Sequence, residues 1–257
     1  MACTLVSTTS GSIVNKPVKE ALVASIERCG RAVLLVDTPD AKRTALKLLA
    51  SDPMLSLGLC AVSLSEWAKE LWSLFGDGRQ VISKEARLLL IHEALDTFEA
   101  QELKPLDVGT GTLKAIETIA RNYLPCINAR DDALGFTVGQ QRVLAVLERY
   151  LDLVHQHGML EQSESYALLV EALPKAYYAL QSVVVSGVEN LSPAEEAFLG
   201  ALAQTMDVHI ILSTPDNYAG DANRAYLKRL SDKLRVDLVF VDDDSEKHDA
   251  EIEALLH

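Results

Sequence analysis

Short, uninterrupted apolar runs recur along this chain, and they constrain its fold more than any other feature. The clearest runs span residues 32–36, 59–62, 183–185 and 208–212. Continuous apolar runs of this length are typical of parallel strands, because helices cover both faces of a parallel sheet. Segments with apolar residues at helical spacing separate the runs, as they do in βαβ units. The sequence therefore predicts an α/β protein with a parallel sheet flanked by helices.

The middle of the chain follows a different pattern. From about residue 83 to residue 180, apolar residues recur at helical spacing and no convincing strand is found. Strand-like runs return after this region. The sequence therefore predicts a discontinuous α/β domain, formed by residues 1–80 and 181–257, and an all-helical subdomain inserted at residues 81–180.

The charge balance bears on the partners of the protein. The chain has 257 residues and a formal net charge of −13. Proteins that bind nucleic acid unaided usually carry a basic excess, because contacts to phosphates supply most of the non-specific affinity. Any contact with DNA must therefore come from a local basic patch or from another part of a larger assembly.

Two groups of basic residues are candidates for such a DNA contact. The first group consists of Lys42, Arg43 and Lys47, and the second consists of Arg224, Lys228 and Arg229. In both groups the spacing places the residues on a predicted helix. A solvated helix face is the alternative interpretation of each group.

Cysteine usage and hydropathy indicate the setting of the protein. The four cysteines lie far apart, without a C-x-x-C pair, and no histidine is spaced for metal ligation. We therefore expect no metal site, and reduced, mostly buried thiols in a cytoplasmic protein. No apolar run approaches the roughly 20 residues of a membrane span. The first residues also lack the basic region of a signal peptide.

Four stretches carry a family resemblance by their order and spacing. They are LVSTTSGS at residues 5–12, LLVDTPD at residues 34–40, VSLSEWA at residues 62–68, and VVVSGVENLSPAE at residues 183–195. Together they resemble the N-terminal, helicase-like region of AddB-type subunits, which belong to the exonuclease V-like helicase–nucleases that process broken DNA ends in bacteria. The resemblance implies a RecA-like sheet of the P-loop NTPase type, with a helical subdomain inserted into it.

The first stretch lies where active members of such a family place a phosphate loop. Aligned without gaps, the pattern G-x-x-x-x-G-K-[ST] falls on residues 7–14. Serine replaces both glycines, Ile13 replaces the lysine that contacts phosphate, and Val14 replaces the hydroxyl that binds magnesium. Lys16 follows three residues too late. An ordinary Ser/Thr/Gly turn is the alternative interpretation of this loop.

The fourth stretch lies where the family places an acidic pair at the end of a strand. Ser186 and Gly187 stand at those positions, and Glu189 is the nearest carboxylate. The resemblance thus implies a vestigial nucleotide site, whose residues are Ser10, Gly11, Ser12, Lys16, Ser186, Gly187 and Glu189. ATP hydrolysis needs the lysine, the hydroxyl and the carboxylates to position magnesium and phosphate. We therefore expect no catalytic residue and no cofactor in this chain.

The resemblance implies a non-catalytic, degenerate superfamily-1 helicase-like domain that acts in DNA repair and recombination. It would serve as a scaffold for a motor helicase–nuclease subunit of AddA type, and it would bind single-stranded or tailed DNA weakly. The parent protein would be a longer, ATP-dependent exodeoxyribonuclease subunit with a PD-(D/E)XK nuclease domain. Two alternatives stay open. One is a noncanonical nucleotide-binding ATPase that uses Lys16 and Glu189, and the other is a stand-alone protein-interaction module.

Overall fold

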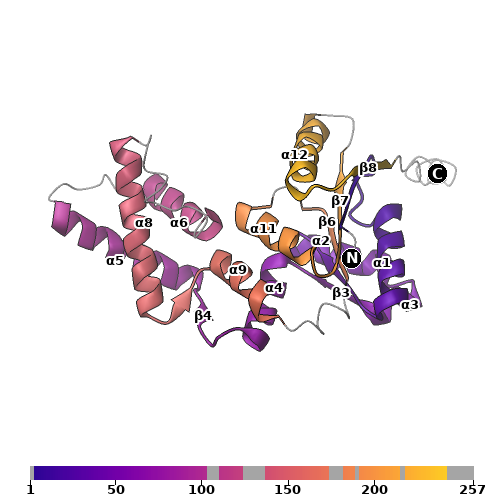
Figure 1. The fold of residues 1–257 in the computed structure, drawn as a ribbon, viewed down its shortest axis with the longest axis horizontal. Coiled ribbons are helices and arrows are strands. Elements are labelled where there is room, and N and C mark those ends of the chain that lie inside the picture. Colours follow the sequence, from indigo (N-terminus) through magenta and orange to yellow (C-terminus); the bar gives the residue numbers. More distant parts are fainter. Residues whose placement is uncertain are drawn as a thin grey trace, which may run out of the picture. The chain divides into compact units, whose positions relative to one another are not determined.

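Contacts within the chain divide it into two compact units (Figure 1). The computed structural model describes residues 3–102, 110–123, 137–173, 182–188, 191–214 and 218–241. The first unit comprises residues 1–67, 173–191 and 199–257, and the second comprises residues 68–172 and 192–198. The sequence predicts the first boundary at residue 80, whereas the units separate after Trp67, within α4 (Leu64–Phe75). A helix that runs from one unit into the next keeps its apolar spacing, so periodicity does not mark this boundary.

A six-stranded parallel sheet forms the centre of the first unit. Its order is β3-β2-β6-β7-β1-β8. The strands are β1 (Cys3–Thr8), β2 (Ala32–Leu35), β3 (Leu59–Val62), β6 (Ser182–Ser186), β7 (Asp207–Ser213) and β8 (Leu238–Val241). All residues of β2 and β6 are buried, as expected for strands covered on both faces. The prediction of an α/β protein with a parallel sheet flanked by helices is confirmed.

The register of the sheet brings the carboxyl ends of its strands to one edge. Thr8 at the end of β1 lies opposite Ser213 at the end of β7. On the other side of β7, Ser186 at the end of β6 lies opposite Ile211. The loops that follow β1 and β6 therefore emerge at the same edge, although these two strands are not neighbours.

The direction in which the chain crosses the sheet decides which face of the sheet each connecting helix covers. The connections from β1 to β2 and from β2 to β3 run toward one edge, and those that follow β6 and β7 run toward the other. Because parallel crossovers are right-handed, the two sets of helices lie on opposite faces. The first face carries α1 (Lys16–Cys29), α2 (Pro39–Leu49) and α3 (Pro53–Gly58), and α12 (Tyr218–Leu234) lies on the second (Figure 1).

Local sequence signals explain where these helices begin and end. Asn15 caps α1 by accepting a hydrogen bond from the Val18 amide, and Gly30 ends the helix in the left-handed conformation, with φ of 74°. Thr38 caps α2 by accepting from the Ala41 amide. The short helix α3 follows α2 after residues 50–52. Asp52 caps α3, and Pro53 stands in its first turn, where a missing amide hydrogen costs nothing.

The second unit is built mainly of helices. They are α4 (Leu64–Phe75), which begins in the first unit, α5 (Lys84–Glu102), α6 (Thr110–Tyr123), α8 (Val138–Gln156), α9 (Gln162–Ala172) and the first part of α11 (Pro193–Leu202). Apolar residues of α5, α6 and α8 form its core, with Ile91, Ile116 and Tyr150 fully buried. Thr137 and Gln140 form a capping box at the start of α8.

A small sheet corrects the prediction that the inserted region is all-helical. β4 (Gln80–Val81) pairs in parallel with β5 (Met159–Leu160). The sequence analysis finds no strand between residues 83 and 180, and β5 lies within that span. Two-residue strands are too short to show an alternating pattern. Their pairing depends on tertiary contacts that bring distant segments together.

Candidate functional site

A pocket of about 420 Å³ opens at the carboxyl edge of the sheet in the first unit. The chain leaves β2 toward β3 but leaves the neighbouring strand β6 toward β7, so the connections diverge between β2 and β6 at this edge. In open α/β sheets, ligands bind at such switch points, outside the carboxyl ends of the strands. The pocket is lined by Gly11, Ser12, Ile13, Asn15, Asp37, Thr38, Ala41, Ser186, Gly187, Leu212, Ser213 and Asn223.

The two halves of the predicted nucleotide site meet in this pocket. Gly11 and Ser12 line it from the loop after β1, and Ser186 and Gly187 line it from the end of β6. The remaining residues of the prediction lie elsewhere. Ser10 is buried and supports the loop, and Lys16 is exposed outside the lining. Glu189 lies outside the residues that the structure describes.

The loop after β1 satisfies its own backbone amides. The amide of Ser10 donates to Thr8 Oγ1 over 3.3 Å, and the amide of Ser12 donates to Ser10 Oγ over 3.2 Å. The amide of Val14 continues the series by donating to Ser12 Oγ over 3.3 Å. Each acceptor is a hydroxyl two residues earlier in the chain, as in Ser/Thr turns. A phosphate loop uses its backbone amides to bind its ligand, whereas here the amides of Ser10, Ser12 and Val14 are already occupied.

The first turn of α1 is occupied in the same way. Helix N-termini bind anions because their first amides have no partner within the helix. In α1 the Val18 amide donates to Asn15 Oδ1 over 3.0 Å, and Pro17 has no amide hydrogen. The Asn15 Nδ2 atom also donates to the Ser12 carbonyl oxygen over 3.2 Å, which ties the loop to the helix.

A direct bond joins the loop to the end of β6. Ser186 Oγ donates to the Ile13 carbonyl oxygen over 2.7 Å. The Ile13 side chain lies beside Gly187, where an added Cβ would come within 3.4 Å of Ile13 Cγ1. In an active phosphate loop, a lysine from one side and a carboxylate from the other would share phosphate and magnesium here. This chain joins the two sides by a hydrogen bond and an apolar contact.

The remaining polar groups of the pocket are mainly acceptors. Asp37 follows β2 and is exposed at the pocket. Asn223 donates its side-chain amide to the Ser213 carbonyl oxygen over 2.7 Å. Among the described residues that line the pocket there is no lysine, arginine or histidine. Sequence reasoning did not single out Asp37 as a site residue, although it lies in the second stretch of the resemblance, and it missed Asn223, which belongs to no recognisable motif.

The basic residues predicted to contact DNA do not form one surface. Lys42, Arg43 and Lys47 belong to α2, and Arg224, Lys228 and Arg229 belong to α12, on the opposite face of the sheet. In the α2 group, Arg43 pairs with Asp40, and Lys42 Nζ lies 3.9 Å from Glu66.

The α12 group is also partly engaged within the protein. Arg224 contacts Asp221 over 2.6 Å and donates to the Thr214 carbonyl oxygen over 3.1 Å. The Arg229 guanidinium lies 5.1 Å from the centre of the Tyr226 ring. Lys228 is exposed. The acidic partners reduce the positive charge that α12 offers to a phosphate backbone.

A buried ion pair in the second unit was also missed by sequence reasoning. Arg87 donates to both carboxylate oxygens of Glu161, over 2.8 and 2.7 Å, and the Tyr150 hydroxyl donates to the same carboxylate. Burial and the adjacent Glu161 carboxylate raise the pKa of Tyr150. Arg87 and Glu161 are 74 positions apart, and nothing in the sequence between them indicates the pair. Because each group is satisfied within the protein, the cluster is structural.

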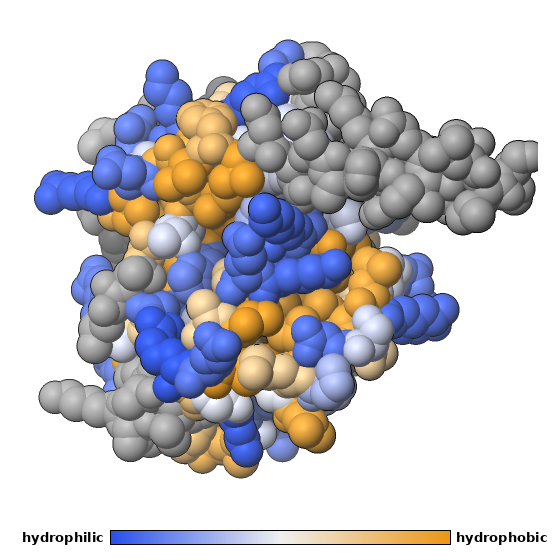
Figure 2. All heavy atoms as spheres, turned by 90° about the vertical axis from the view of Figure 1, so that its right-hand side faces the viewer, coloured by the Kyte–Doolittle hydropathy of each residue, from blue (hydrophilic) through white to orange (hydrophobic). Residues whose placement is uncertain are grey.

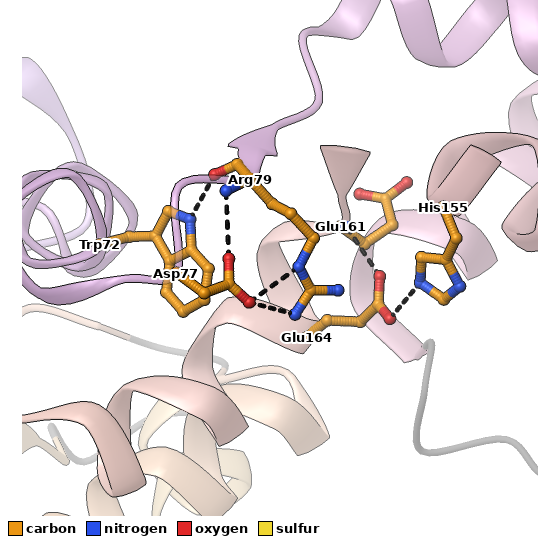
Figure 3. A network of polar contacts seen from close by, with 6 residues as sticks. All are labelled: Trp72, Asp77, Arg79, His155, Glu161 and Glu164. Carbon is orange, nitrogen blue, oxygen red and sulfur yellow. Dashed lines mark hydrogen bonds and ion pairs between the residues drawn. The ribbon is translucent and has the colours of Figure 1, made fainter. Parts of the chain in front are cut away.

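A second polar network lies at the small sheet of the same unit (Figure 3). Arg79 donates to Asp77 over 2.9 and 2.7 Å, and this hydrogen bonding lowers the pKa of Asp77. The Arg79 carbonyl oxygen accepts from the Trp72 indole over 2.7 Å. Glu164 accepts from the Glu161 amide over 2.8 Å and lies 2.7 Å from His155 Nε2. These contacts hold β4, β5 and the first turn of α9, and they leave no obvious reactive group.

The cysteines and the metal prediction can be compared with the described residues. The prediction of mostly buried thiols is wrong for Cys60, which is exposed, whereas Cys3 and Cys29 are partly buried. Cys126 lies outside the described residues. Within the described ranges, no group of three or more His, Cys, Asp or Glu side chains could hold a metal ion.

No protein-family model matches this chain, and no curated protein sequence matches it either. The family resemblance of the four sequence stretches therefore stays a prediction. In the part of the chain that the structure describes, no helix has the length and apolar character needed to cross a membrane.

Proposed function

We propose that this chain is a non-catalytic, helicase-like domain with a degenerate nucleotide site, and that it acts as a scaffold in the processing of broken DNA ends. The observation that carries this proposal is the bond between Ser186 and Ile13. This bond lies where the loop after β1 and the end of β6 would meet in a nucleotide site. It joins the two segments without phosphate or magnesium.

The strand order supports the RecA-like fold that the resemblance implies. β7 alone lies between β1, which precedes the loop, and β6, which ends at Ser186. In RecA-like sheets one strand likewise separates the strand before the phosphate loop from the strand before the acidic pair. The pocket at this edge is the place where such a fold binds nucleotide.

The chemistry of the pocket favours a scaffold over the alternative of an ATPase. Phosphoryl transfer depends almost entirely on positioning and on cations that offset the developing charge. Ile13 supplies no charge, the amides of Ser12 and Val14 are occupied, and Lys16 does not line the pocket. Asp37 adds a negative charge that would repel a triphosphate.

Exposed apolar side chains in the first unit support a role in protein contact. Met54 and Leu57 on α3, and Val239 and Phe240 on β8, are all largely exposed. The face in Figure 2 carries hydrophobic patches among charged side chains. Exposed apolar patches commonly mark sites of protein interaction. Under the proposal, the partner is a motor helicase–nuclease subunit of AddA type, and DNA is contacted weakly.

Binding of the motor subunit tests this proposal. The chain is immobilised, and a purified AddA-type motor subunit is titrated over it in a biosensor, with and without tailed DNA. We expect saturable binding that a Leu57→Glu or a Phe240→Glu variant weakens, whereas Lys19→Glu, at an exposed charged position on α1, does not. Absence of saturable binding to the motor subunit, with the chain shown to be folded, would contradict the scaffold role.

A further inference from the structure

The pocket at the carboxyl edge of the sheet has the opposite hydrogen-bonding character to a phosphate site. A phosphate site presents free donors and positive charge to its ligand. In this pocket the amides of Ser12 and Val14 donate to hydroxyls of the loop. At the first turn of α2, Thr38 Oγ1 accepts from the Ala41 amide over 3.1 Å. Backbone donors on both sides of the pocket are therefore used within the protein, and the lining side chains include no lysine, arginine or histidine.

Acceptors, in contrast, remain available. Within the described part of the chain, the carboxylate of Asp37 and the hydroxyl of Ser213 make no hydrogen bond or ion pair. Asn223 uses its nitrogen as a donor, so its amide oxygen is left as an acceptor. These three side chains come from the segments after β2, at the end of β7 and in α12, and all of them line the pocket.

We propose that this pocket binds a cationic group, a guanidinium or an ammonium, and not an anion. Such a group offers only hydrogen-bond donors. Its positive charge would complement the negative charge of the Asp37 carboxylate. A guanidinium is the better match, because its planar fork can donate two parallel hydrogen bonds to one carboxylate. A volume of about 420 Å³ is ample for an arginine side chain or a small guanidine compound. The inference rests on the pocket geometry and does not require the DNA-repair role.

The positively charged N-termini of the helices near the pocket would repel a cation, but this repulsion is limited. The N-termini of α1 and α2 each carry about half a unit of positive charge, which falls off within the first turn. Asn15 and Thr38 place side-chain oxygens on these termini. The full negative charge of Asp37 lies at the pocket itself, and the chain as a whole has a net charge of −13, which draws cations toward it.

A guanidinium could come from a free small molecule or from an arginine of another protein, and two probes distinguish these sources. The first probe is agmatine, and the second is a short, blocked peptide with one arginine between glycines. The matched control peptide carries citrulline, which keeps the shape of arginine and removes its charge. Binding is followed by the backbone NMR signals of Gly11 and Gly187, both of which line the pocket.

We expect one or both guanidinium probes to shift these signals saturably. Citrulline in place of arginine, or Asp37→Asn in the protein, should weaken binding about tenfold, as expected for the loss of one charge-assisted hydrogen bond. Asp40→Asn removes the same charge three residues away, outside the pocket, and should leave the affinity unchanged. Binding of agmatine alone assigns the pocket to a free cation, and binding of the arginine peptide alone assigns it to a partner side chain.

Two results would overturn the inference. The first is that neither guanidinium probe shifts the signals of Gly11 and Gly187. The second is that Asp37→Asn binds the probes as tightly as the unaltered chain. ATP with magnesium is titrated in parallel, because saturable binding of ATP would contradict the degenerate nucleotide site. Failure of the guanidinium probes without any ATP binding would leave the scaffold proposal standing.

Discussion

Ser186 Oγ donates to the Ile13 carbonyl oxygen over 2.7 Å, and this bond joins the end of β6 to the loop that follows β1. The two residues are 173 positions apart. Ser186 is buried, and Ile13 lies beside Gly187 with its side chain against the glycine. Together with the contact of Ile13 with Gly187, the bond therefore links two connections that leave strands which are not neighbours in the sheet.

Removal of this bond should loosen the loop after β1. We expect Ser186→Ala to lower the free energy of unfolding by about 1 kcal/mol, because the Ile13 carbonyl oxygen loses its donor. Urea unfolding followed by circular dichroism measures the change. Ser213→Ala is the matched control, since the Ser213 hydroxyl makes no hydrogen bond within the described residues. Equal stability of the two variants would show that the bond contributes nothing.

Nucleotide should not stabilise the folded chain. A ligand that binds only the folded state raises the melting temperature, and the rise grows with the ratio of free ligand concentration to Kd. Because the amides of Ser12 and Val14 are occupied and Ile13 replaces the lysine, we expect no shift with millimolar ATP and magnesium. Differential scanning calorimetry checks this. A rise in the melting temperature that Lys16→Ala abolishes would instead favour the ATPase alternative.

The buried pair of Arg87 and Glu161 should contribute strongly to the stability of the second unit. Glu161→Gln leaves the Arg87 guanidinium buried without a counter-charge, and such changes cost about 3–5 kcal/mol. Urea unfolding with a probe in the second unit, such as Trp72 fluorescence, measures the loss. Asp77→Asn breaks a more exposed pair and should cost less than about 1 kcal/mol. A similar loss in both variants would contradict the special role of the buried pair.

His209 should make the stability of the first unit depend on pH. Burial lowers the pKa of His209 in the folded protein, and Thr4 Oγ1 lies 2.6 Å from its Nδ1 atom. The unfolded chain therefore binds the proton more readily, so this contribution is complete above the unfolded pKa, about 6.5, and is lost as the pH falls below it. We expect His209→Asn to reduce the stability difference between pH 8 and pH 5, measured by urea unfolding. An unchanged difference would contradict this assignment.

Contact of α12 with DNA should be sensitive to charge. If the exposed Lys228 contacts phosphate, Lys228→Glu should weaken binding of fluorescent tailed DNA several-fold, and the salt dependence should become less steep. Lys19→Glu on α1 makes the same charge change on the opposite face of the sheet and should have little effect. Fluorescence anisotropy at two salt concentrations measures both. Equal weakening by the two variants would show that only the overall charge of the protein affects DNA binding. That result would contradict a DNA contact at α12.

The sequence by itself determined the architecture of the first unit, because burial on both faces requires apolar runs such as those of β2 and β6. It also determined the ends of several helices, since a cap such as Thr137 acts through residues three positions away. Local patterns could not show the pairing of β4 with β5, whose strands have two residues each.

Only the tertiary structure decided the character of the pocket. The resemblance placed residues 10–12 and 186–187 in one vestigial site, but it did not indicate that Ser186 bonds Ile13 or that Asp37 and Asn223 complete the lining. The same holds for the pair of Arg87 and Glu161, and for the separation of the basic helices on two faces of the sheet. Sequence patterns report interactions between residues a few positions apart. These features arise from side chains that meet only when the parallel strands and their crossovers are assembled.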